Sequence, residues 1–169
     1  MSGATTNGSS APARPRVRVL MVCLGNICRS PMAEALLRHK LRGRVDLAHV
    51  DVDSAGTGAW HAGEEPDPRT RETLRAHGIA EWSRARQFAA PADFDAFDHV
   101  VAMDEDNVAT LLRMPGARRD KVSLATSWVG GGEGPVADPY YGTISDFEAI
   151  FRQLDGITDA MLVALSAKR

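Results

Sequence analysis

The sequence predicts an α/β fold in which one parallel β-sheet is covered by helices on both faces. Apolar runs typical of strands alternate with amphipathic segments typical of helices, an order that favours parallel strands. The run Val19–Val22 is wholly apolar, as expected for a strand buried on both sides. The 169 residues can form one substantial core but are too few for two domains. We therefore expect a single-domain, three-layer αβα structure with a four-stranded parallel sheet, of flavodoxin-like or Rossmannoid type.

Four segments have the pattern of strands. The first, residues 17–23, is apolar nearly throughout and ends at Cys23. The second, residues 50–55, alternates between apolar and polar side chains until a glycine-rich stretch ends it. The third covers residues 97–103, and the fourth, with a weaker pattern, covers residues 122–125.

Two helices are predicted in the first half of the chain. The first covers residues 31–42, because Pro31 suits the first helical position and the hydroxyl of Ser30 suits the N-cap. The second covers residues 68–77, where a proline follows an aspartate at the start and Gly78 closes the end.

Two more helices are predicted in the second half. One covers residues 105–113, and a long final helix begins at Ser145, where apolar residues recur at helical spacing. Asp67, Asp104 and Asp155 are expected to lie at helix ends and to act as caps.

Composition excludes several classes of function. The net charge of −2 gives no sign of nucleic-acid binding, and no apolar run is long enough for a membrane span. Residues 1–15 resemble a disordered N-terminal tail rather than a signal peptide, which leaves residues 16–169 as the folded domain. Two cysteines are too few for a disulfide framework or a convincing metal site, so we expect a cytoplasmic protein without metal or cofactor. Export without a signal peptide stays open.

The most informative stretch is Cys23–Arg29, which we call the phosphate loop. A cysteine, five residues and an arginine lie between a predicted strand and a predicted helix N-terminus. Backbone N–H groups and the helix dipole at such a place attract anions. Gly25 and Asn26 tolerate the unusual backbone angles that a tight anion-binding loop requires. The spacing alone is weak evidence, but its position predicts a phosphate site with a nucleophilic thiol at its base.

A second loop converges on the same place. Residues 138–142, which we call the acid loop, follow the last predicted strand, 115 positions after Cys23. In open parallel sheets, ligands bind beyond the carboxyl ends of the strands. The sequence therefore predicts that Asp138 and Cys23 belong to one site.

At these motifs the chain closely resembles the low-molecular-weight protein tyrosine phosphatases. The resemblance runs from about residue 17 to the C-terminus. The matching segments are residues 23–34, 54–58, 60–61, 66–69, 84–87, 103–104 and 138–142. It implies a metal-independent protein-tyrosine phosphatase whose partner is a phosphotyrosine-containing protein, with phosphate, sulfate or a similar oxyanion held in the phosphate loop.

The resemblance also implies catalytic roles. Cys23 is the expected nucleophile, since loop N–H groups, the helix end and Arg29 all favour its thiolate. Arg29 is expected to bind two phosphoryl oxygens with its planar fork, and Asp138 is expected to be the general acid and then the base. Read without that context, these residues are a buried cysteine, a surface arginine and an ordinary Asp-Pro turn.

The remaining expected site residues bind or surround the substrate. Those in the phosphate loop or directly after it are Leu24, Gly25, Asn26, Ile27, Cys28 and Ser30. Aromatic side chains from two other segments, Trp60, Tyr140 and Tyr141, are expected to line a deep cleft that fits a phenyl ring.

Three supporting residues have alternative interpretations. Ser30 either hydrogen-bonds the sulfur of Cys23 or only caps the helix, and both roles can coexist. Cys28 either traps an oxidised Cys23 as a disulfide or only packs the loop. The resemblance implies that Asn26 and Ser54 support the phosphate loop. The chain differs from some members of that family at Ser83, where they have histidine.

Three alternative functions are less favoured. A thioredoxin-coupled arsenate reductase needs further cysteines downstream, and none follows Cys28. Protein-arginine phosphatases of this type carry threonine at the position of Ile27 and lack the tyrosine pair. A non-catalytic phosphotyrosine-binding module would not need Cys23, Arg29 and Asp138 together.

Overall fold

The computed structural model describes residues 14–167 and contains a four-stranded sheet in which all strands are parallel. The strands are β1 (Val17–Cys23), β2 (Val50–Gly56), β3 (His99–Ala102) and β4 (Val122–Leu124), in the spatial order β2-β1-β3-β4. The predicted fold class is therefore confirmed. Most of the predicted tail, residues 1–13, lies outside the described residues, so the domain boundaries stay a prediction.

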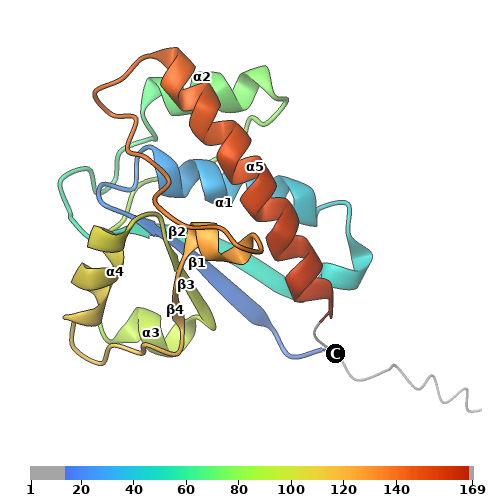
Figure 1. The fold of residues 1–169 in the computed structure, drawn as a ribbon, viewed down its shortest axis with the longest axis vertical. Coiled ribbons are helices and arrows are strands. Elements are labelled where there is room, and N and C mark those ends of the chain that lie inside the picture. The colour runs from blue at the N-terminus through green and yellow to red at the C-terminus, as the bar shows by residue number, and fades with distance from the viewer. Residues whose placement is uncertain (1–13, 168–169) are drawn as a thin grey trace, which may run out of the picture.

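Helices cover both faces of the sheet (Figure 1). One face carries α1 (Arg29–Leu41), α2 (Pro68–Ala76) and α5 (Ile144–Ala167), and the other carries α3 (Ala92–Ala96) and α4 (Glu105–Leu112). Both faces need a cover because successive side chains of a strand point to opposite faces of the sheet.

The buried side chains of β1 pack into the hydrophobic core on both faces of the sheet. Val19 and Met21 pack in the core with α1 and α5, whereas Leu20 and Val22 pack with Phe94 on the other face. A run of four consecutive apolar residues is thus explained by burial on both sides.

The start of α1 differs from the prediction. The helix begins at Arg29, and its first bond runs from the N–H of Met32 to the carbonyl of Cys28. Cys28 occupies the N-cap without a side-chain cap bond. The expectation that Ser30 is the cap is therefore wrong, because this residue already lies inside the helix and its hydroxyl is bonded elsewhere.

Of the three aspartates predicted to be helix caps, two are confirmed and one is wrong. Asp67 and Asp104 cap α2 and α4 by accepting backbone N–H bonds. Asp155 is not a cap, since it lies in the middle of α5, where it forms an ion pair with Lys40.

Some elements are shorter than expected or were not predicted. β3 begins two residues later than predicted because Phe97 is the C-cap of the unpredicted helix α3, where its N–H bonds the carbonyl of Asp93. Short 3₁₀ turns at Val45–Leu47 and Ala125–Trp128 were also not predicted. Within residues 14–167, no helix has the length and apolar character that a membrane span requires.

Candidate active site

The phosphate loop leaves the carboxyl end of β1 and runs directly into α1. Asn26 adopts φ of 56°, in the left-handed region that asparagine enters more readily than most residues. Its side-chain amide donates to the hydroxyls of Ser30 at 2.8 Å and Ser54 at 2.9 Å, and its side-chain oxygen accepts from the N–H of Arg86 at 3.0 Å. These three bonds hold the loop, which is the role that the resemblance implied for Asn26 and Ser54.

The loop carbonyls point away from the loop centre. The N–H groups of Thr57, Gly58, Asp67 and Met32 bond the carbonyls of Cys23, Leu24, Ile27 and Cys28 respectively. A Cβ on Gly56 would lie 2.8 Å from the carbonyl oxygen of Leu24, so only glycine lets β2 approach so closely. With its carbonyls bonded outward, the loop can turn its N–H groups towards an anion.

The thiol of Cys23 lies at the base of this loop and is 3% exposed. Its sulfur is 2.9 Å from the hydroxyl of Ser30 and accepts from the N–H of Asn26 at 3.3 Å. The sulfur thus lies within hydrogen-bonding distance of two polar groups at the base of the loop. Of the two interpretations of Ser30, the contact with sulfur is the one present in the structure.

Arg29 is buried and surrounded by acidic groups. Its Nη1 donates to Asp104 at 2.6 Å and to the carbonyl of Val136 at 3.0 Å, and its Nη2 lies 3.8 Å from the carboxylate of Asp138. Burial is the largest single influence and lowers the pKa of Arg29. The opposing influences are the charge of Cys23 and the hydrogen bond and charge of Asp104, and together they raise the pKa above its ordinary value. The guanidinium therefore stays charged and is held in a fixed orientation.

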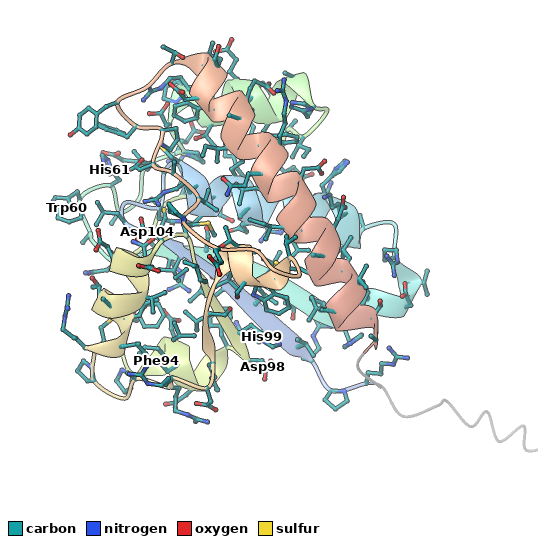
Figure 2. The ribbon with its side chains drawn as sticks, in the orientation of Figure 1. Trp60, His61, Phe94, Asp98, His99 and Asp104 are labelled. Carbon is teal, nitrogen blue, oxygen red and sulfur yellow. The ribbon has the colours of Figure 1, made fainter. Side chains whose placement is uncertain are left out.

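Asp104 is a site residue whose second role was not predicted. One carboxylate oxygen accepts from the N–H of Asn107 and caps α4, and the other holds Arg29. Its position two residues after β3, at the ligand-binding edge of the sheet, was the available signal. Figure 2 shows it on the same side of the molecule as Trp60 and His61.

The acid loop lies over the phosphate loop. The carboxylate of Asp138 accepts from the N–H of Tyr140 at 3.1 Å, and the N–H of Gly142 bonds the carbonyl of Pro139 at 2.8 Å. The side chain of Asp138 is 44% exposed, which leaves it accessible to a substrate.

The two loops and the neighbouring segment with Trp60 and His61 line a cavity of about 370 Å³. Ten of the twelve predicted site residues line it: Cys23, Leu24, Gly25, Ile27, Cys28, Arg29, Trp60, Asp138, Tyr140 and Tyr141. The other two, Asn26 and Ser30, are buried and do not line the cavity, whereas His61 lines it without having been predicted. Tyr141 is 96% exposed and meets Tyr140 edge-on, so the aromatic side chains form an open rim rather than a closed wall.

A buried carboxylate supports the loop from behind. Glu34 is fully buried and accepts hydrogen bonds from the hydroxyls of Ser54 and Ser83, each at 2.7 Å, and from Arg38 at 2.5 Å. Ser54 in turn bonds Asn26. The serine at position 83 thus completes this network, and the role of Glu34 was not predicted.

Cys28 is buried in the same loop. Burial is the main cause that raises the pKa of its thiol far above the ordinary range, and the charge of Asp67 acts in the same direction. Cys28 is therefore a neutral thiol. Among residues 14–167, no group of three or more histidine, cysteine or acidic side chains could hold a metal ion.

Comparisons with known proteins agree on one family. The family model described as "Low molecular weight phosphotyrosine protein phosphatase" matches residues 18–169. A Streptomyces coelicolor protein named low molecular weight protein-tyrosine-phosphatase is 44% identical over 154 residues, covering 88% of this chain and 93% of its own length.

Solved structures are similar along nearly the whole chain. The crystal structure of YfkJ from Bacillus subtilis has a TM-score of 0.84 and 35% identity, covering 91% of this chain and 97% of its own. YwlE arginine phosphatase from Geobacillus stearothermophilus has a TM-score of 0.79 and 35% identity, covering 88% and 92% respectively.

Proposed function

The chain belongs to the low molecular weight phosphotyrosine protein phosphatase family, and from that membership we propose that it hydrolyses phosphotyrosine in proteins through a cysteinyl-phosphate on Cys23. The observation that carries this proposal is the meeting of Cys23, Arg29 and Asp138 around one cavity. These groups are a thiol nucleophile, an anion-binding fork and a carboxyl group, and phosphoester hydrolysis by way of cysteine requires all three.

In the first step the sulfur of Cys23 attacks phosphorus, the S–P bond forms, and the bond from phosphorus to the phenolic oxygen breaks. Arg29 and the loop N–H groups bind the equatorial oxygens, where charge is spread in the transition state. Asp138 gives its proton to the departing phenolic oxygen. Without that proton the leaving group would be a phenolate, which is unfavourable at neutral pH because the pKa of tyrosine is about 10.

In the second step water hydrolyses the cysteinyl-phosphate. The carboxylate of Asp138 takes a proton from water, the new O–P bond forms, and the S–P bond breaks. The hydroxyl of Ser30, 2.9 Å from the sulfur, stabilises the thiolate that leaves. The product phosphate, or sulfate in its place, is held by the phosphate loop until release.

The cavity favours an aryl phosphate. Trp60 and Tyr140 present aromatic surface at its mouth, and aromatic surface packs well against a phenyl ring. The thiol lies at its base, and a phosphoserine side chain is too short to bring its phosphate there.

A protein-arginine phosphatase is the second candidate, since two of the similar solved structures carry that name. Ile27 and the pair Tyr140 and Tyr141 count against it, because arginine phosphatases of this type carry threonine at the first position and lack the tyrosine pair. Ile27 lines the cavity, so its side chain bears directly on substrate choice.

The deciding experiment measures phosphate release in EDTA from matched peptides that carry phosphotyrosine, phosphoserine or phosphoarginine. We expect turnover of the phosphotyrosine peptide alone, and we expect Asp138→Asn to lower it by about 100- to 10,000-fold. Preference for phosphoarginine would favour the second candidate. Absence of turnover, with phosphate still bound, would contradict the enzymatic proposal.

Cys28 provides a separate test of redox protection. Peroxide converts the Cys23 thiolate to a sulfenic acid, and condensation with the Cys28 thiol forms a disulfide and water. We expect the wild type to regain most of its activity after peroxide followed by a dithiol, and Cys28→Ser to regain much less, each relative to its own untreated sample. Equal recovery would mean that Cys28 only packs the loop.

A further inference from the structure

Arg69 on α2 binds the backbone of the acid loop. Its Nη2 donates to the carbonyl of Tyr140 and its Nη1 donates to the carbonyl of Gly142, each at 2.9 Å. Within residues 14–167, these are the hydrogen bonds that reach the backbone of residues 139–142 from outside the loop. Arg69 therefore supplies the hydrogen bonds that hold the segment after Asp138, in which Pro139 is also buried by packing.

The other side of Arg69 is tied to the phosphate loop. Its Nε and Nη2 donate to the two carboxylate oxygens of Asp67 at 3.0 and 2.9 Å. The N–H of Asp67 and the hydroxyl of Thr70 both bond the carbonyl of Ile27, at 2.9 and 3.0 Å. A continuous series of hydrogen bonds thus joins Ile27, at the base of the cavity, to the acid loop.

Packing restricts Arg69 further. Its guanidinium lies 4.5 Å from the centre of the Phe147 ring, and Phe147 is fully buried in α5. The hydrogen bonds that Arg69 donates to Asp67 raise the pKa of Arg69, so the pair stays charged. The planar fork makes four directed side-chain bonds at once, which the single ammonium group of lysine cannot reproduce.

We propose that Arg69 is a positioning residue that holds Asp138 at the correct place relative to the phosphate loop by clamping the acid loop to Asp67 and Ile27. The proposal rests on the proposed function, in which Asp138 protonates the leaving group. Arg69 itself does not line the cavity. Its loss should therefore weaken proton transfer more than phosphate binding.

The leaving group separates these effects. An acidic nitrophenol departs readily as an anion and needs little help from an acid, whereas phenol, with a pKa of about 10, needs a proton. If Asp138 is misplaced, the hydrolysis of an aryl phosphate should slow more when its leaving phenol is more basic. A merely destabilised protein should slow all of them equally.

The experiment compares kcat/KM over a series of aryl phosphates from nitrophenols to phenol, together with the inhibition constant of inorganic phosphate. The variant is Arg69→Lys and the reference is Asp138→Asn. Arg71→Lys is the matched control, because Arg71 lies on the same helix and pairs with Glu65 and the carbonyl of Pro66 instead of the acid loop.

We expect Arg69→Lys to lose about 100-fold with phenyl phosphate, the scale of a misplacement of about 1 Å, and only a few-fold with nitrophenyl phosphates. The slope against leaving-group pKa should steepen towards that of Asp138→Asn, phosphate inhibition should stay within about twofold, and Arg71→Lys should follow the wild type. If Arg69→Lys folds poorly, Asp67→Asn should show a smaller change of slope in the same direction, since asparagine still caps α2.

Two results would overturn the inference in distinguishable ways. If Asp138→Asn steepens the slope but Arg69→Lys and Asp67→Asn do not, the clamp is wrong and the proposed function stands. If Asp138→Asn leaves the slope flat, the general-acid role fails and the clamp fails with it.

Discussion

Replacing Cys23 with serine is expected to abolish phosphotyrosine hydrolysis, with a loss on the order of 10⁴- to 10⁶-fold, the scale seen when a catalytic nucleophile is removed. A serine hydroxyl does not ionise near neutral pH, so the N–H of Asn26 and the hydroxyl of Ser30 cannot activate it as they can a thiolate. The measurement is phosphate release from a phosphotyrosine peptide at saturating concentration.

The variant should otherwise resemble the wild type. Serine is nearly the same size as cysteine and can still bond Ser30, so the thermal midpoint should change little. Inorganic phosphate should still raise that midpoint, because Arg29 and the loop backbone are intact. Retained turnover in Cys23→Ser would disprove the covalent mechanism, whereas loss of both turnover and phosphate binding would indicate a damaged loop.

Replacing Arg29 with lysine is expected to cause the second large loss of activity. We expect kcat to fall on the order of 10³-fold, because lysine keeps the charge but loses the planar fork that binds two oxygens in the transition state. Arg29 is 3% exposed and is oriented by Asp104 and Val136, so a lysine ammonium would be drawn to Asp104 rather than to the phosphate.

The control for charge-conserving substitution is Arg118→Lys, which affects an exposed ion pair with Asp120 and should leave kcat unchanged. A parallel measurement with Asp104→Asn tests orientation, since that variant removes the charge that holds Arg29 and should also lower kcat, though by less. A kcat for Arg29→Lys within about threefold of the wild type would refute the role of the fork, which is expected to contribute far more.

The fold and most of the candidate site could be predicted from the sequence, because the local patterns of strands and helices and the order of these elements indicated the same parallel sheet. Alternation of strands and helices implied a parallel sheet, and parallel strands end at the same edge. Cys23 and Asp138 could therefore be placed together although they are 115 positions apart. The residues that line the cavity lie in two loops beyond those strand ends and one neighbouring segment.

Helix boundaries were harder to predict, because a residue that suits a helix cap can also form other hydrogen bonds. Ser30 followed by proline resembles a helix start, yet its hydroxyl bonds Cys23 and Asn26 and the helix begins earlier. A hydroxyl has several possible partners, and the sequence does not show which of them the fold brings nearest.

The sequence by itself determined the α/β class, the order of elements, the phosphate loop and the convergence of Cys23 with Asp138. The tertiary structure alone decided the double role of Asp104, the buried network around Glu34 and the clamp formed by Arg69. Each of these depends on where a side chain points across tens of positions, for example the 75 between Arg29 and Asp104. Periodicity determines which face of an element is buried, but the direction and partner of a polar side chain depend on packing that forms only when distant segments meet.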